Sequence, residues 1–137
     1  MKKDIRDIED IKLLVDTFYN KVSADGLLGP IFNDVAKVDW SKHLPIMYNF
    51  WNSILFGAQG YKGNPMDAHF RLDKKRHLEG NDFNTWKTIF METIDELFEG
   101  EIADSAKKKA VSIADLMFFK LQNHEQSAGV NIGKIRR

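Results

Sequence analysis

Residues 63–72 read GNPMDAHFRL, a stretch that combines a strong helix start with a lone histidine. Asn64 is a favoured helix N-cap, Pro65 fits the first helical position, and Asp67 suits the positive end of the helix dipole. We therefore expect His69 to lie on a short helix that begins abruptly after a glycine-rich loop and is soon ended by charged residues. Because a short helix adds little to a core, its predicted role is to hold this histidine in place.

The rest of the chain predicts further helices. Apolar residues recur at helical spacing nearly everywhere, and no strand-like alternation persists. The six predicted segments are approximately 8–22, 27–35, 40–56, 65–72, 82–98 and 102–123. Asp39 is the expected cap of the third segment, and Gly57 its expected end. The sequence thus predicts an all-α domain over residues 1–125, followed by a flexible polar tail at 126–137.

The composition is that of an ordinary globular domain. The 137 residues are 43% hydrophobic and 29% charged, and 20 basic residues balance 20 acidic ones. This balance argues against nucleic acid or a membrane surface as a partner. The absence of cysteine excludes disulfides, thiolate nucleophiles and cysteine-ligated metal sites. The first residues lack the apolar stretch of a signal peptide, and no apolar run reaches the roughly 20 residues of a membrane span. The expected location is the cytoplasm.

Rare side chains fall on two predicted helix faces. The third helix presents His43, Met47, Phe50 and Ile54 on one face, and the fifth presents Phe83, Trp86, Phe90 and Thr93. Tyr19 comes late on the first helix. If these faces meet His69, they enclose a slot that suits a flat apolar cofactor with a metal centre. Taken alone, an aromatic stripe at helical spacing is usually just a packed core, and a lone histidine is more often a surface or hydrogen-bonded residue than a ligand. His77 and His124 have polar neighbours and are expected to be exposed.

Several longer motifs agree in order and spacing with one known family. They are FYNKV (18–22), LLGPIF (27–32), HLPIMYNFW (43–51), LFGAQGYKGNPMDAHF (55–70) and FNTWKTIF (83–90), followed by an alanine-rich helix. Together they resemble the truncated haemoglobins, most closely the third group, over about residues 5–124. The resemblance implies a shortened globin fold, in which a two-over-two helical sandwich surrounds haem b (iron protoporphyrin IX).

The resemblance also implies roles for individual residues. His69 corresponds to the proximal iron ligand. The distal pocket corresponds to Tyr19, His43 and Trp86, while Phe32 and Met47 match positions that pack on haem. Arg71, Lys75 and Arg76 are alternative partners for the haem propionates, and the sequence does not choose among them.

The function implied by this family is the binding of a diatomic gas: oxygen, nitric oxide or carbon monoxide. Tyr19 and Trp86 are expected to donate hydrogen bonds to oxygen from two sides, whereas His43 either donates or acts as a gate. Such a pocket suits tight retention of oxygen, or its reaction with nitric oxide or reduced species. The residues do not distinguish binding alone from dioxygenase-like or peroxidase-like chemistry. A reductase is an expected partner, and the chain is expected to be a monomer or weak dimer.

The alternative interpretation is a haem-free helical interaction module. In that case the aromatic residues form an ordinary core, and His69 only supports local structure.

The orientation of His43 is a separate open question. It lies at the start of the third helix, beside the charged Lys42, and this position also allows its side chain to point outward to solvent.

Overall fold

The computed structural model describes residues 2–61 and 63–133, with side chains as far as Asn123. The helices are α1 (Ile8–Ala24), α2 (Leu28–Pro30), the π-helical turn η1 (Ile31–Val35), α3 (Trp40–Phe56), α4 (Pro65–Lys75), α5 (Gly80–Leu97) and α6 (Glu101–Gly133). Over these residues the chain is all-α, as the sequence predicts. Within the same ranges, no helix is both long and apolar enough to cross a membrane.

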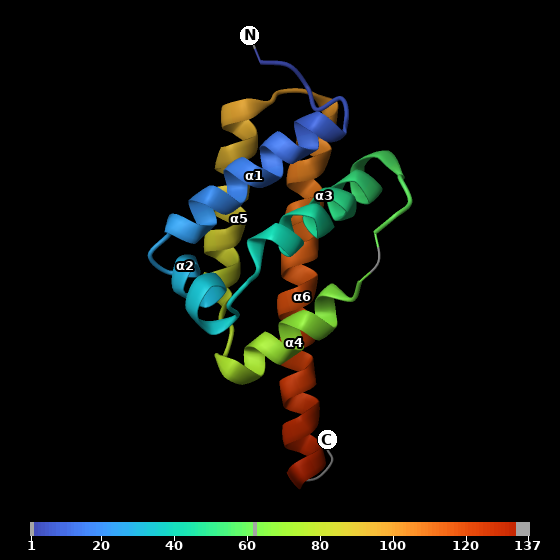
Figure 1. Cartoon of the computed structure of the whole chain (residues 1–137). Helices are drawn as coiled ribbons and strands as arrows, with labels where there is room; N and C mark the ends of the chain where they lie inside the picture. The colour runs from blue at the N-terminus through green and yellow to red at the C-terminus, as the bar shows by residue number, and fades with distance from the viewer. Residues whose placement is uncertain (1, 62, 134–137) are drawn as a thin grey trace.

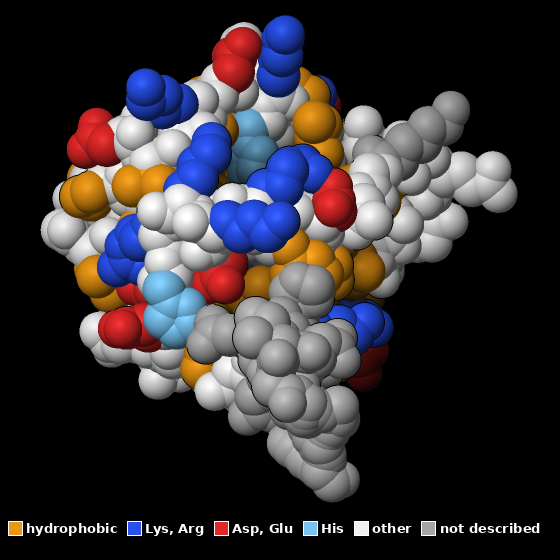
Figure 2. Space-filling model, turned by 90° about the horizontal axis from the view of Figure 1, so that it is seen from below, with side chains coloured by type: hydrophobic (Ala, Val, Ile, Leu, Met, Phe, Trp, Pro, Cys, Tyr) orange, Lys and Arg blue, Asp and Glu red, His pale blue; other side chains and the backbone are white. Residues whose placement is uncertain are grey.

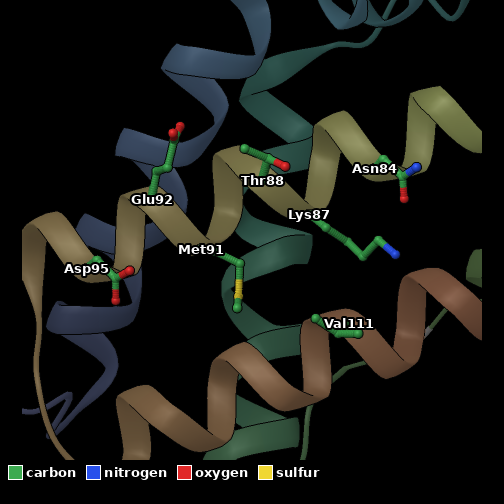
Figure 3. A pocket seen from close by; sticks show the side chains of 7 residues that line it. All are labelled: Asn84, Lys87, Thr88, Met91, Glu92, Asp95 and Val111. Carbon is green, nitrogen blue, oxygen red and sulfur yellow. The ribbon is translucent and has the colours of Figure 1, made fainter.

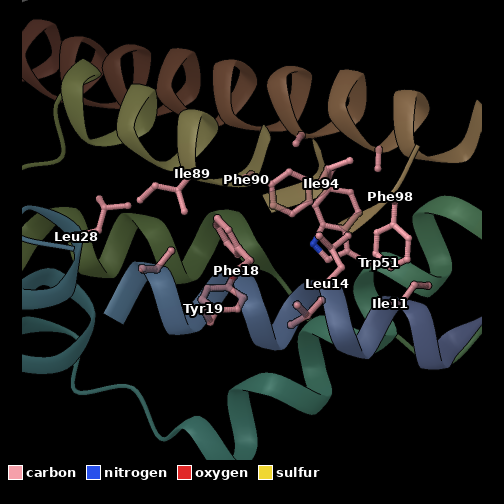
Figure 4. Packing of buried hydrophobic residues seen from close by; sticks show 14 of the residues in the cluster. Ile11, Leu14, Phe18, Tyr19, Leu28, Trp51, Ile89, Phe90, Ile94 and Phe98 are labelled. Atoms are coloured by element: carbon pink, nitrogen blue, oxygen red, sulfur yellow. The ribbon is translucent and has the colours of Figure 1, made fainter. Parts of the chain in front are cut away.

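The four long helices form two crossing layers (Figure 1). α1 packs on α3 in one layer, and α5 packs along α6 in the other, while α1 also packs directly on α5. The core between them is apolar and includes Leu14, Phe18, Trp51, Phe90 and Ile94, all 2% exposed or less (Figure 4). α4 contributes no fully buried residue, but it packs on α6, and its part-buried Met66, Phe70 and Leu72 contact the edge of this core. The arrangement therefore leaves α4 as a separate short helix that carries His69.

The predicted helix signals act as expected at both ends of α3 and at the start of α4. The Asp39 carboxylate accepts the Ser41 N–H at 3.1 Å, and Gly57 ends α3 in the left-handed conformation with φ 68°. The Asn64 side chain accepts the Asp67 N–H at 3.0 Å, and Pro65 opens α4. These caps fix the direction of α4 independently of the helix before it.

Two predicted helix ends are wrong. The charged run at 73–76 does not interrupt the helix of His69, because α4 continues to Lys75 and Arg76 is its C-cap. Lys74 and Lys75 occupy the last turn, where positive charge stabilises the helix dipole. α6 extends to Gly133, ten residues past its predicted end at Asn123, and the added segment contains no proline that would end the helix. The predicted flexible tail at 126–137 is described only in part. Its side chains, and the whole of residues 134–137, lie outside the described residues.

The connection from α1 to α3 depends on one close backbone contact. A Cβ atom at Gly29 would lie 2.6 Å from the Ser23 carbonyl oxygen, so only glycine allows this approach to the end of α1. The next turn is π-helical, closed by a hydrogen bond of 2.8 Å from the Ala36 N–H to the Ile31 carbonyl. This turn places Phe32 beside the start of α3.

Asp4, near the beginning of the chain, forms the N-terminal cap of α6. The Asp4 carboxylate accepts the N–H groups of Ile102 at 2.9 Å and Ala103 at 2.8 Å, and so caps the last helix from a position 98 residues earlier in the chain. Burial alone would raise the pKa of Asp4, but these backbone hydrogen bonds hold it below its ordinary value of 3.8. The ionised form is therefore the one that stabilises the fold.

Replacing Asp4 with alanine is expected to lower the free energy of unfolding by about 1 kcal/mol at pH 7, the usual loss for a helix cap. Since the pKa of Asp4 is depressed in the folded state, its contribution is complete above pH 3.8 and is lost as the pH falls through the lower folded value. Urea titrations of both proteins at neutral and acid pH measure this difference. Asp34→Ala, at an exposed position on η1, is the control, and an equal loss in this control would contradict the capping role.

Candidate functional site

His69 is held in a defined protonation state by its own helix. Its Nδ1 lies 2.6 Å from the Pro65 carbonyl oxygen, one turn earlier on α4. Because a carbonyl oxygen can only accept, Nδ1 carries the proton and Nε2 keeps its lone pair. Burial lowers the pKa of His69, which favours the neutral ring, although the Pro65 contact acts in the opposite direction. An imidazole oriented in this way is ready to ligate a metal through Nε2.

His43 faces the same region from α3. Its Nε2 is buried and has no hydrogen-bond partner among the described residues. Burial lowers the pKa of His43, and the nearby His69 lowers it further. The ring meets the edges of Tyr19 at 5.2 Å and Trp40 at 5.7 Å between centroids. His43 thus points inward rather than to solvent, and its unpartnered Nε2 is available to a polar group.

Tyr19 and Trp86 form a hydrogen-bonded pair between α1 and α5. The Trp86 indole N–H donates to the Tyr19 hydroxyl, which is buried. Burial strongly raises the pKa of Tyr19, so the phenol stays protonated and can still donate its own proton. The sequence predicts two parallel donors to one ligand. Because the Trp86 N–H approaches the Tyr19 hydroxyl, the two side chains can also act in series, with Trp86 supporting Tyr19.

Phe32 and Trp40 complete the aromatic wall around Tyr19. Their rings are stacked at 5.9 Å and 16°, and the Trp40 ring lies 5.4 Å from that of Tyr19. The Trp40 Nε1–H donates to Asn33 Oδ1 at 3.3 Å, which fixes the ring. Sequence reasoning placed Phe32 here but treated Trp40 only as the first residue of a helix. The sequence does contain a signal for Trp40: it lies three residues before His43, which places both side chains on the same helix face.

The apolar faces predicted to line the slot are only half-buried. On α3 this holds for Met47, Phe50 and Ile54, although Trp51 on the same helix is 2% exposed. On α5, Phe83 and Trp86 are half-buried, whereas Phe90 and Thr93 are fully buried. Part-exposed apolar side chains on these two helices offer surface for a flat apolar ligand to cover.

Basic side chains surround this region. Viewed from below, the molecule shows a recess with a histidine in it and Lys and Arg side chains around its rim (Figure 2). Of the three candidates from sequence, Arg71 pairs with Asp67, and Arg76 holds Asp82 through two contacts of 2.8 and 3.3 Å. Lys75 is exposed, and the described residues include no ion-pair partner for it. The rim therefore suits a ligand with negative groups at its edge.

A second surface depression lies away from these residues, between α5 and α6 (Figure 3). Its lining includes Lys87, Met91, Asp95 and Val111. Lys87 is paired with Asp115 at 2.6 Å, and the depression is shallow and open. Neither His43 nor His69 reaches it, so it is a surface groove rather than part of the site.

The remaining histidines do not join the site. His77 is exposed, as predicted, and its Nδ1 lies 3.3 Å from Asp73. His124 falls outside the residues whose side chains are described.

Comparisons with known proteins place this geometry in context. No protein-family profile matches the chain. The curated protein "Group 3 truncated hemoglobin ctb" of Campylobacter jejuni is 30% identical over 130 residues, covering 90% of this chain and 100% of that protein. A crystal structure of a group III truncated hemoglobin from Campylobacter jejuni superposes with a TM-score of 0.78 at 31% identity, covering 88% of this chain and 95% of that one. Both similarities extend over nearly the whole of each partner.

Proposed function

The chain belongs to the group III truncated haemoglobins of the globin superfamily, and from this premise we propose that it binds oxygen at a haem b held by His69. Membership in the family implies a haem globin. The observation that supports the proposed ligand is the contact between His69 Nδ1 and the Pro65 carbonyl, which leaves Nε2 free to ligate.

The residues around His69 and His43 fit the cofactor. Phe32 and Met47 supply half-buried apolar side chains from η1 and α3, and His43 contributes an unpartnered buried nitrogen. Of the three basic candidates for the propionates, Lys75 is the one we select, because Arg71 and Arg76 already bind carboxylates. A ferrous haem with one histidine ligand supplies an open coordination position for oxygen, nitric oxide or carbon monoxide.

The distal side chains determine how tightly a diatomic ligand is retained. Tyr19 keeps its proton, since burial raises its pKa, and its hydroxyl is oriented by the Trp86 N–H. A phenol oriented in this way donates to a ligand that gains negative charge, without loss of entropy to a rotating hydroxyl. His43 occupies the space beside Tyr19, and we assign it mainly to ligand access. This pocket favours slow release over bulk transport.

The finer functional assignments rest on the family resemblance and on this pocket. Reaction of bound oxygen with nitric oxide, or peroxide chemistry, needs a return of electrons, so a reductase is the proposed partner. The proposed location is the cytoplasm, where reductants keep iron ferrous. The proposed assembly is a monomer or weak dimer.

The absorption spectrum of the purified protein tests this function directly. A Soret band that shifts on adding dithionite and carbon monoxide is the expected result. A colourless protein that stays folded and takes up no hemin would favour the alternative, a haem-free helical interaction module. The buried Nε2 of His43, which has no hydrogen-bond partner among the described residues, favours the haem-binding proposal over that alternative.

Loss of haem is expected to lower the melting temperature strongly. At a haem concentration of about 1,000 times the Kd, linkage adds about 4 kcal/mol, or roughly 10–20 °C for a domain of this size. Differential scanning calorimetry of the apoprotein and of the haem-loaded protein measures the shift. Iron-free protoporphyrin IX is the matched control and should give a smaller increase, because it lacks the bond to His69. Equal melting temperatures with and without haem would remove the cofactor from the core.

A further inference from the structure

A continuous series of aromatic rings leads from the slot to a surface loop. Trp86 is stacked on Phe90 at 5.4 Å and 4°, and Phe90 is stacked on Trp51 at 4.9 Å and 20°. Trp51 meets the edge of Phe50 at 5.4 Å, and Phe50 meets the edge of Tyr61 at 5.1 Å. Figure 4 shows Trp51 beside Phe90 in the core. We call these five residues the ring path.

The two ends of the ring path lie in different surroundings. Trp86 is half-buried in the wall of the slot and bonds to Tyr19. Phe90 and Trp51 are enclosed, at 0% and 2% exposed. Tyr61 is half-buried in the loop that joins α3 to α4. The path therefore runs from the candidate ligand site, through dry protein, to a phenol with access to water.

The chemistry of the rings suits the transfer of single electrons. Tryptophan and tyrosine give up an electron more readily than other side chains without sulfur, and this chain contains no cysteine to compete. Transfer between rings falls steeply with distance, so contacts between neighbouring rings are what such a route needs. Phe90 and Phe50 are not oxidised readily themselves, but they bridge the oxidisable rings of Trp86, Trp51 and Tyr61.

We propose that the ring path delivers an electron from Tyr61 to the slot when a peroxide is reduced there, an inference that rests on the proposed haem function. Reduction of one hydrogen peroxide to two waters takes two electrons and two protons. Oxidation of ferrous to ferric iron supplies one electron. Tyr61 supplies the other electron and its phenolic proton, becoming a neutral tyrosyl radical, and solvent supplies the second proton. Trp51 and Trp86 each pass the electron inward and are restored.

Tyr61 is the natural end of the route because a tyrosine loses its proton as it is oxidised. Tyr19 is closer to the slot, but it is only 7% exposed, and its oxygen already accepts the Trp86 N–H. Water reaches the half-buried Tyr61 and can accept its proton. The ring path would carry the oxidation from the slot to Tyr61, so that the side chains that hold the cofactor are not oxidised.

Spin trapping on the ferrous haem-loaded protein tests the proposal. Anaerobic hydrogen peroxide is added with a nitroso spin trap, and peptide mass spectrometry locates the adducts. We expect the main adduct on Tyr61, with Tyr48 as the internal control, since Tyr48 makes none of the ring contacts of the path and its hydroxyl donates to Asp16. Trp51→Phe keeps a ring of similar shape but removes the oxidisable step. It is expected to reduce the Tyr61 adduct to the level found on Tyr48.

Tyr61→Phe provides a second test if Trp51→Phe does not fold. Without Tyr61 as the terminal electron donor, the oxidation should remain on Trp51 or Trp86. It would be detected there as spin-trap adducts or as hydroxylated Trp51. Equal labelling of Tyr61 and Tyr48, a main adduct on Tyr19, or no response to either substitution would overturn the ring path. A normal carbon monoxide spectrum in the same samples would leave the haem function standing. Failure to bind haem would overturn both.

Discussion

The variant His69→Ala is expected to lose haem at least about 100-fold faster than the parent protein, since outer-shell changes alone reach that range in metal affinity. Alanine removes Nε2, the ring nitrogen that is free to ligate iron because the proton is on Nδ1, which binds the Pro65 carbonyl. The substitution also leaves a hole of imidazole size on α4. Added imidazole should fill this hole and restore haem retention. The rate is measured at the Soret band as haem transfers to an excess of a different apoglobin.

His77→Ala is the matched control for this variant. His77 lies just past the end of α4, is exposed, and interacts with Asp73 through Nδ1 rather than facing the slot. Its replacement should leave haem retention unchanged. A normal five-coordinate ferrous spectrum in His69→Ala would contradict the assignment and identify His43 or His77 as the ligand instead.

The sequence predicted most of the fold because its signals are local. Asp39 and Gly57 bound α3, and Asn64 with Pro65 opens α4, through caps formed within a few residues of each other. The end of α4 was missed because charged residues are equally common in loops and in last helical turns. The end of α6 was missed because the segment after Asn123 is polar and contains glycine, a composition that is typical of a loose tail.

The prediction of the site was limited by contacts between distant segments. Faces spaced at 3.6 residues identified His43 and Trp86 one helix at a time. That Trp86 donates to Tyr19 rather than to open space depends on how α1 meets α5, which no local pattern encodes. The contact of Arg76 is likewise not encoded locally. Arg76 binds Asp82 in the first turn of the following helix, so we do not select it as the partner of the haem propionates.

The serial arrangement of Tyr19 and Trp86 sharpens the expectation for oxygen release. Tyr19→Phe removes the donor to the ligand and should speed oxygen dissociation roughly fivefold to tenfold, equivalent to about 1–1.4 kcal/mol, with more if the pocket is dry. Trp86→Phe removes only the group that orients the hydroxyl, so its effect should be smaller. The double variant should then match Tyr19→Phe, which is non-additive behaviour.

His43→Leu separates ligand access from ligand retention in the same experiment. Its ring fills the space against Tyr19 and Trp40, so its loss is expected to change mainly the association rate of carbon monoxide. Stopped-flow oxygen release and flash-photolysis rebinding on the four variants measure both quantities. Additive effects of Tyr19→Phe and Trp86→Phe would show that each donates to the ligand separately. Unchanged release in Tyr19→Phe, together with a large increase in His43→Leu, would instead assign the stabilising donor to the buried Nε2 of His43, the one described side-chain nitrogen that is enclosed without a partner.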